Sequence, residues 1–84
     1  MKIVWDEPKR HRNLAKHSLD FADLTLEFFL SALVGPAREG RFKAVGELSG
    51  QIVVVVVFKP LGTEALSIIS MRPASRKERT RRWP

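Results

Sequence analysis

The 84-residue sequence contains no cysteine, which excludes disulfide bonds, thiolate metal ligands and cysteine nucleophiles. It also lacks a long hydrophobic run: the longest spans seven residues, 52–58, whereas a membrane-spanning helix needs about 20. The amino terminus carries charge at Lys2 and Asp6 and has no apolar core of the kind found in signal peptides. We therefore expect no membrane partner, and a protein that remains in the cytoplasm, where it is made.

The motifs that mark nucleotide cofactors and catalytic metals are missing as well. The chain has no GxxxxGK and no GxGxxG segment, and its two histidines, His11 and His17, are six positions apart without an HExxH pattern. Phosphate-cradling loops and zinc sites require such spacings. We expect no cofactor and no metal ligands.

The composition indicates a small folded protein with an uneven distribution of charge. Hydrophobic residues make up 44% and charged residues 29% of the chain, as in ordinary globular proteins, and the length suits one domain over residues 1–84. The net charge is +6; residues 72–82 hold six cations and one anion, against nine cations and eight anions elsewhere. Such a local excess points to a polyanion or an acidic protein as the partner.

Local patterns predict an α+β fold with the element order β-α-α-β-β-β-α. Residues 52–58 have no polar face, so their strand should be central in the sheet. Ser75 and Glu78 match the S-x-x-E capping box of a short last helix. Three successive strands with short turns favour an antiparallel sheet with the helices packed on it. The expected elements are a strand at 1–5, helices at 8–16 and 21–30, a loop at 35–40, strands at 41–48, 51–58 and 64–71, and a helix that begins at Ser75.

The basic segment after the last strand could act on RNA in two ways. Arginine makes forked hydrogen bonds to phosphate, so the segment could simply bind nucleic acid. It could also stabilise the charge that grows on the phosphate oxygens when a 2′-hydroxyl attacks the backbone, but arginine keeps its proton and is a poor acid or base. The candidate proton carriers are Glu78, His17, His11 and the lysines. Glu78 could equally be only a helix cap, and His17 only a residue that closes the first helix.

Three segments together resemble the BrnT-type toxins, a family of small ribonuclease toxins. The matching positions span nearly the whole chain, in the order and spacing of the family pattern. They are Trp5, Asp6, Lys9, Asn13, Lys16, His17, Leu19 and Phe21 in the first segment, Arg41 and Gly46 in the second, and Ile68, Ile69, Ser70, Arg72, Ala74, Ser75, Glu78 and Arg79 in the third.

The resemblance implies a RelE-like fold and a ribonuclease toxin of a type II toxin–antitoxin system, which cleaves RNA without a metal and arrests translation and growth. It also implies a BrnA-type antitoxin with a ribbon-helix-helix domain as the partner, and operator DNA bound only through the toxin–antitoxin complex. Four positions depart from the family pattern: Ser18 replaces a glycine, Ser67 an arginine, Phe58 a tyrosine and Trp83 the closing tyrosine. These departures leave a weakened toxin as an open possibility.

We assign RNA cleavage through a 2′,3′-cyclic phosphate to two groups of residues. In the catalytic group the arginines converge on the scissile phosphate while Glu78 or His17 moves protons; its members are Arg72, Arg76, Glu78, Arg79 and His17. The RNA-binding group is Lys9, Arg12, Lys16, Arg41 and Trp83. The alternative is a non-catalytic module that binds nucleic acid or an acidic antitoxin segment, and a third possibility is a structural subunit whose basic face serves assembly.

Overall fold

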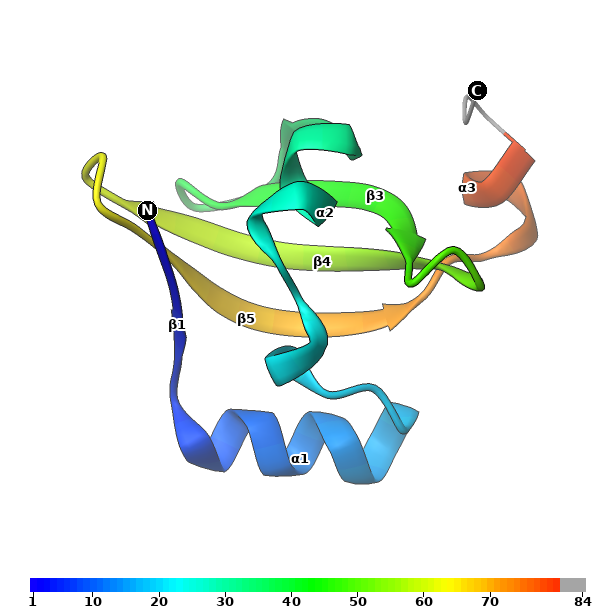
Figure 1. The fold of residues 1–84 in the computed structure, drawn as a ribbon, viewed down its shortest axis with the longest axis horizontal. Coiled ribbons are helices and arrows are strands. Elements are labelled where there is room, and N and C mark those ends of the chain that lie inside the picture. Colours follow the sequence, from blue (N-terminus) through cyan, green and yellow to red (C-terminus); the bar gives the residue numbers. More distant parts are fainter. Residues whose placement is uncertain (81–84) are drawn as a thin grey trace.

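Helices pack against a five-stranded sheet in an α+β arrangement, as the sequence predicts (Figure 1). The computed structural model describes residues 1–80. Its elements in chain order are β1 (Lys2–Trp5), α1 (Glu7–His17), the 3-10 turn η1 (Phe21–Asp23), α2 (Leu26–Ser31), β2 (Leu33–Pro36), β3 (Phe42–Leu48), β4 (Ile52–Leu61), β5 (Ala65–Pro73) and α3 (Arg76–Thr80). No helix in this part of the chain is long and apolar enough to cross a membrane.

The sheet has the strand order β1-β5-β4-β3-β2 and is mixed rather than antiparallel. β3, β4 and β5 form the expected antiparallel meander, and β4 is the central strand. At one edge, however, β1 pairs parallel with β5, from Lys2 opposite Ala65 to Trp5 opposite Ile68. β1 and β5 come from opposite ends of the chain, and no local sequence pattern records the direction in which two such strands meet.

The other edge is a strand that the sequence does not predict. β2 pairs antiparallel with β3, from Leu33 opposite Val45 to Pro36 opposite Phe42, so the expected loop begins after residue 36. β2 has only four residues and includes Gly35 and Pro36, which are depleted in strands and tolerated mainly at sheet edges. Its composition therefore resembles that of a loop.

The single helix expected at 21–30 is two pieces, η1 and α2. The Asp20 side chain accepts a hydrogen bond (2.9 Å) from a backbone N–H of η1, and Thr25 Oγ1 accepts one (3.2 Å) from the N–H of Phe28. Thr25 is thus the N-cap of α2 and lies inside the segment expected to form one helix, residues 21–30. Leu24 and Thr25 have extended backbone between the two pieces, so α2 is a separate helix.

The hydrophobic core lies between the helices and one face of the sheet. Phe21, Leu24 and Phe28, which recur at helical spacing in the segment 21–30, are all buried. Gly46 lies directly beneath Phe28: a Cβ at this position would be 3.0 Å from the phenyl ring. The strand side of the core is made by Ala44, Leu48, Val54, Val56, Phe58, Leu66, Ile68 and Met71. Helix α1 lies beside β5 (Figure 1), and its contact with the edge of that strand forms the candidate site.

Ser18 ends α1 in the left-handed backbone conformation, with φ 57° and ψ 30°. Serine at such a φ costs about 1 kcal/mol relative to glycine, while glycine loses part of that advantage through its freedom in the unfolded chain. We expect Ser18→Gly to raise the free energy of unfolding by about 0.5 kcal/mol, measured by urea unfolding. Ser31→Gly, at the last helical position of α2, is the control and should lower it, since glycine has a lower helix propensity than serine and the change removes the hydrogen bonds from the Ser31 hydroxyl to the carbonyls of Glu27 and Phe28. A less stable S18G protein would contradict the assignment of strain to Ser18.

Candidate active site

A shallow cleft between α1 and β5 collects basic side chains. Its volume is about 360 Å³ and its lining is Lys9, Arg12, Asn13, Lys16, His17, Ile69 and Ser70. We call it the α1 cleft. No carboxylate lines it, so its charge is wholly positive and suits an anion. Four of the residues assigned from the sequence to RNA binding or catalysis meet here: Lys9, Arg12, Lys16 and His17.

Helical spacing explains why these side chains meet. Lys9, Asn13 and Lys16 follow one another at i, i+4 and i+7, which places them on one face of α1. The helix itself is locally favoured: Glu7 in the first turn and Lys16 in the last turn carry charges that suit the helix dipole, and Pro8 suits the first turn because its backbone is preset for a helix start. The sequence predicts this helix well, and the structure adds that its basic face meets the edge of β5.

Asn13 holds the middle of this face against β5. It is the buried polar residue of the described chain, 8% exposed. Its Oδ1 accepts a hydrogen bond (3.1 Å) from the N–H of Met71, and its Nδ2 donates one (3.2 Å) to the carbonyl of Leu19. From the sequence, Asn13 had no role beyond its place in the family pattern. An uncharged amide between lysines on one helix face could have indicated a side chain that bonds to the rest of the fold.

Arg10 forms ion pairs with Glu7 and Asp20 that stabilise the start of α1. The Arg10 guanidinium binds both oxygens of Asp20 (2.7 and 3.0 Å) and one oxygen of Glu7 (3.0 Å). The hydrogen bonds from Arg10, and then the N–H of Ala22, lower the pKa of Asp20 to about 2. Glu7 also accepts a hydrogen bond (2.7 Å) from the indole of Trp5. Arg10 therefore serves the fold and is already neutralised.

The carboxyl end of β5 joins α3 through a second ion pair. Arg72 donates two hydrogen bonds of 2.8 Å to the two carboxylate oxygens of Glu78. The predicted capping box is confirmed: the Ser75 N–H donates to Glu78 Oε1 (2.8 Å), and the Glu78 N–H donates to Ser75 Oγ (3.2 Å). Hydrogen bonding to Arg72, followed by that to Ser75, lowers the pKa of Glu78 to about 2 despite partial burial. Glu78 is thus a firmly charged and weak base.

This pair should make stability depend on pH in acid. Because the folded protein holds the pKa of Glu78 at about 2, below its ordinary 4.5, its contribution is complete above pH 4.5 and disappears as the pH falls towards 2. We expect Glu78→Gln to lower the free energy of unfolding at pH 7 by about 1–2 kcal/mol, a modest value because Arg72 is partly exposed. The difference from wild type should shrink below pH 4.5.

Urea unfolding at pH 7, 4.5 and 3 measures this dependence. Glu64→Gln removes the same charge from the exposed β4–β5 turn and should behave like wild type. A difference between E78Q and wild type that stays constant down to pH 3 would contradict the linkage.

The remaining basic residues of the carboxyl end do not gather around a described cleft. Arg76 and Arg79 lie exposed on α3, and neither takes part in an ion pair among residues 1–80. The α1 cleft is lined by none of Arg72, Arg76 and Arg79, so the expected convergence of guanidinium groups is not seen there, and Arg72 faces Glu78 instead. Trp83 lies outside the described residues.

Ser70 connects the two basic regions. It lines the α1 cleft, and the alternation of side chains along β5 puts it on the same face of the sheet as Arg72, which pairs with Val55. Two residues along a strand span about 7 Å, so the α1 cleft and the Arg72–Glu78 pair are neighbours. Arg41 precedes β3, two strands from β5, and does not line the α1 cleft.

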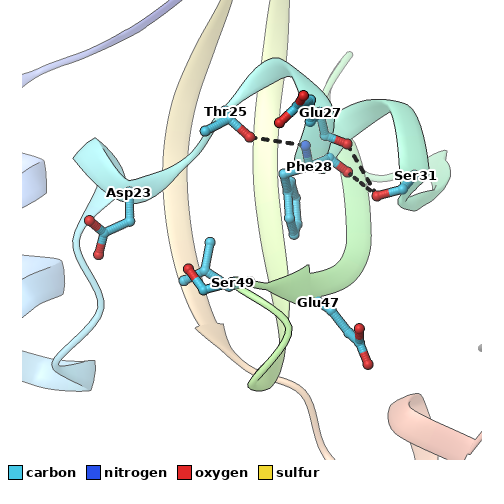
Figure 2. A pocket seen from close by; sticks show the side chains of 8 residues that line it. Asp23, Thr25, Glu27, Phe28, Ser31, Glu47 and Ser49 are labelled. Carbon is cyan, nitrogen blue, oxygen red and sulfur yellow. Dashed lines mark hydrogen bonds between the residues drawn. The ribbon is translucent and has the colours of Figure 1, made fainter.

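A second cleft has the opposite charge. It lies between α2 and the end of β3, has a volume of about 330 Å³, and is lined by Asp23, Thr25, Glu27, Phe28, Ser31, Glu47, Leu48 and Ser49 (Figure 2). Its three carboxylates point in different directions, and no three His, Asp or Glu side chains of residues 1–80 are placed to share a metal ion. A phosphate would be repelled here and attracted to the α1 cleft.

Comparison with known proteins identifies the family. The sequence profile of the ribonuclease toxin BrnT, of type II toxin–antitoxin systems, matches residues 5–78. The chain belongs to the BrnT family. The crystal structure of the Brucella abortus ribonuclease toxin BrnT is 63% identical to it, superposes with a TM-score of 0.87, and is matched over 90% of this chain and 99% of that one. A comparison with curated protein sequences gave no match.

Three of the residues that depart from the BrnT pattern lie in the described structure, all outside the lining of the α1 cleft. Ser18 occupies the left-handed end of α1, where the pattern has glycine. Phe58 is buried and stacks on Phe42 with ring centroids 5.9 Å apart, so the missing tyrosine hydroxyl belongs to the core region and not to the α1 cleft. Ser67 lies on β5 between Val4 of β1 and Lys59 of β4. The basic lining of the α1 cleft is untouched by these changes.

Proposed function

We propose that this BrnT family member is an endoribonuclease that cleaves RNA in the α1 cleft without a metal ion. The observation that carries the proposal is the gathering of His17 with Lys9, Arg12 and Lys16 in one cleft that contains no carboxylate. Imidazole commonly exchanges protons near neutral pH, and cations favour the phosphate and the charge it gains during attack. One cleft therefore offers both kinds of group that the reaction needs.

The proposed reaction is a transphosphorylation within the RNA strand. The 2′-oxygen attacks the adjacent phosphorus as His17 accepts the 2′-hydroxyl proton, a 2′-O–P bond forms and the P–O5′ bond breaks. Lys9, Arg12 and Lys16 stabilise the added charge on the non-bridging oxygens, and one of the lysine ammonium groups protonates the leaving 5′-oxygen. The products are a 2′,3′-cyclic phosphate and a 5′-hydroxyl.

The carboxyl-terminal residues take supporting parts in this proposal. Glu78 is too weak a base to accept the 2′-hydroxyl proton, because its pKa is held at about 2; it orients Arg72 instead. The phosphates that follow the scissile one are contacted by Arg72, Arg76 and Arg79. The RNA reaches these arginines by passing Ser70, which lies between the α1 cleft and Arg72. Arg41, which does not line the α1 cleft, and Trp83 complete the proposed RNA contacts.

Family membership supports a proposal about the biological role. A type II toxin has a protein antitoxin, and we propose a BrnA-type ribbon-helix-helix protein that also carries the complex to operator DNA. Residues 1–84 act as one toxin domain in the cytoplasm, where RNA cleavage arrests translation and growth. Expression with and without the product of the adjacent gene tests this role: arrest that the neighbour relieves is the expected result, and arrest that the neighbour leaves unchanged would contradict it.

Incubation of the purified protein with end-labelled RNA and EDTA tests the chemistry. We expect discrete fragments that end in 2′,3′-cyclic phosphate, and the same RNA with 2′-deoxynucleotides at the cut positions should remain whole because the nucleophile is missing. RNA that is shifted in a gel but intact would support the non-catalytic binding module, and RNA that is neither cut nor bound would support the structural subunit. Cleavage that EDTA abolishes would contradict a metal-free reaction.

A further inference from the structure

Asn13 stands at the centre of the basic face of α1. Lys9 is one turn before it and Lys16 and His17 are one turn after it, so the three flank a single buried amide. All four line the α1 cleft. The rotation of α1 about its own axis, which decides where the three charged groups point, therefore depends on how this amide is held.

The bonding partner of Asn13 is an open sheet edge. Pairing between β1 and β5 ends at Trp5 opposite Ile68, where the chain leaves β1 to form α1. From Ile69 onward no strand of residues 1–80 pairs with this edge of β5, and α1 packs there. Asn13 Oδ1 accepts the N–H of Met71 on that edge, in a buried place where an unpaired N–H would be costly.

The same hydrogen bond links the two basic regions. Met71 lies between Ser70, which lines the α1 cleft, and Arg72, which binds Glu78 of α3. Within residues 1–80, the bond from Met71 to Asn13 is the side-chain hydrogen bond that joins α1 to β5. The second bond of Asn13, to the carbonyl of Leu19, ties down the chain just after His17.

We infer that Asn13 is a positioning residue for RNA cleavage. It fixes the orientation of His17 and of the cations of α1 relative to the RNA phosphates, which bind near Ser70 and Arg72. This inference rests on the proposed function. Asn13 itself is 8% exposed in the wall of the cleft, its amide is hydrogen-bonded to Met71 and Leu19, and it acts through its neighbours. Misplacing a reacting group by about 1 Å can cost on the order of 100-fold in rate, so the loss should fall mainly on kcat while the cations continue to attract RNA.

The test compares Asn13→Ala with a variant that destabilises the fold at a site away from the α1 cleft. Thr25→Ala removes one side-chain hydrogen bond, the cap of α2, and lies away from the α1 cleft. Cleavage is measured well below both melting temperatures, with kcat and KM determined separately. We expect N13A to lose about 10- to 100-fold in kcat with a much smaller change in KM, and T25A to keep both near wild type. Hydrogen exchange of the Met71 amide should accelerate in N13A alone.

The outcomes separate the inference from the proposed function. Wild-type cleavage with N13A as active as T25A would overturn the positioning role alone. A loss in N13A that appears only as raised KM, or that disappears once the unfolded fraction is corrected for, would overturn it as well. RNA left intact by the wild type would overturn the proposed function and the inference together.

Discussion

Replacing His17 by alanine should lower the rate of RNA cleavage by about two to four orders of magnitude, the usual contribution of a positioned acid or base. His17 is half-buried and is the histidine of the α1 cleft, and Glu78 cannot substitute for it with a pKa of about 2. RNA affinity should change little, because Lys9, Arg12 and Lys16 remain. Single-turnover cleavage measures the rate, and binding of RNA with 2′-deoxynucleotides at the cut positions measures the affinity.

His11→Ala is the matched control for this change. It removes an imidazole from the same helix, but His11 is 68% exposed, lies 3.4 Å from Glu7 and is not part of the cleft lining. We expect H11A to cleave RNA at the wild-type rate. Full activity in H17A, or an equal loss in the two variants, would remove His17 from the reaction and favour a proton carrier elsewhere.

Removing three charges from the α1 cleft should have the second largest effect, this time on binding. In the triple variant Lys9→Gln, Arg12→Gln and Lys16→Gln, RNA affinity at low salt should fall by at least about tenfold. The slope of log affinity against log salt should become shallower by about 2, since each phosphate contact on a single strand contributes about 0.7. Titration of the uncleavable RNA at several salt concentrations measures both quantities.

A second triple variant tests whether the position of the charge matters. Lys2→Gln, Lys43→Gln and Lys59→Gln remove the same charge from exposed positions on the strands, away from the α1 cleft. We expect a small loss of affinity and a nearly unchanged salt slope. Equal losses in the two triple variants would mean that RNA responds to net charge alone and that the cleft is not its binding site.

The sequence predicts those parts of the fold that are encoded locally. The strand at 52–58 has no polar side, so both of its faces must be covered. A central position in the sheet meets this need, and β4 takes that position. Ser75 and Glu78 form their capping box because two residues three positions apart suffice to specify it. The parallel pairing of β1 with β5 and the strand β2 depend on contacts between distant segments, and the spacing of nearby residues does not encode them.

The candidate site also contains features that the sequence predicts and features that depend on contacts between distant segments. Lys9, Arg12, Lys16 and His17 could be named from composition, helical spacing and family pattern, and the structure brings them into one cleft. The sequence could not indicate that Ile69 and Ser70 face them, or that the N–H of Met71 bonds to Asn13, because that depends on where β1 stops pairing with β5. Nor could it indicate that Arg72 binds Glu78: six cations near one anion leave open which of them the carboxylate chooses.

The most direct test of the α1 cleft as the RNA site is an NMR titration with the uncleavable RNA, following backbone amides along the whole chain. The account predicts that the largest shifts occur between Lys9 and His17 and at Ser70, weaken towards Arg72, and leave the acidic cleft at Glu27 and Glu47 unchanged. Shifts that spare α1 and concentrate elsewhere on the protein would contradict it.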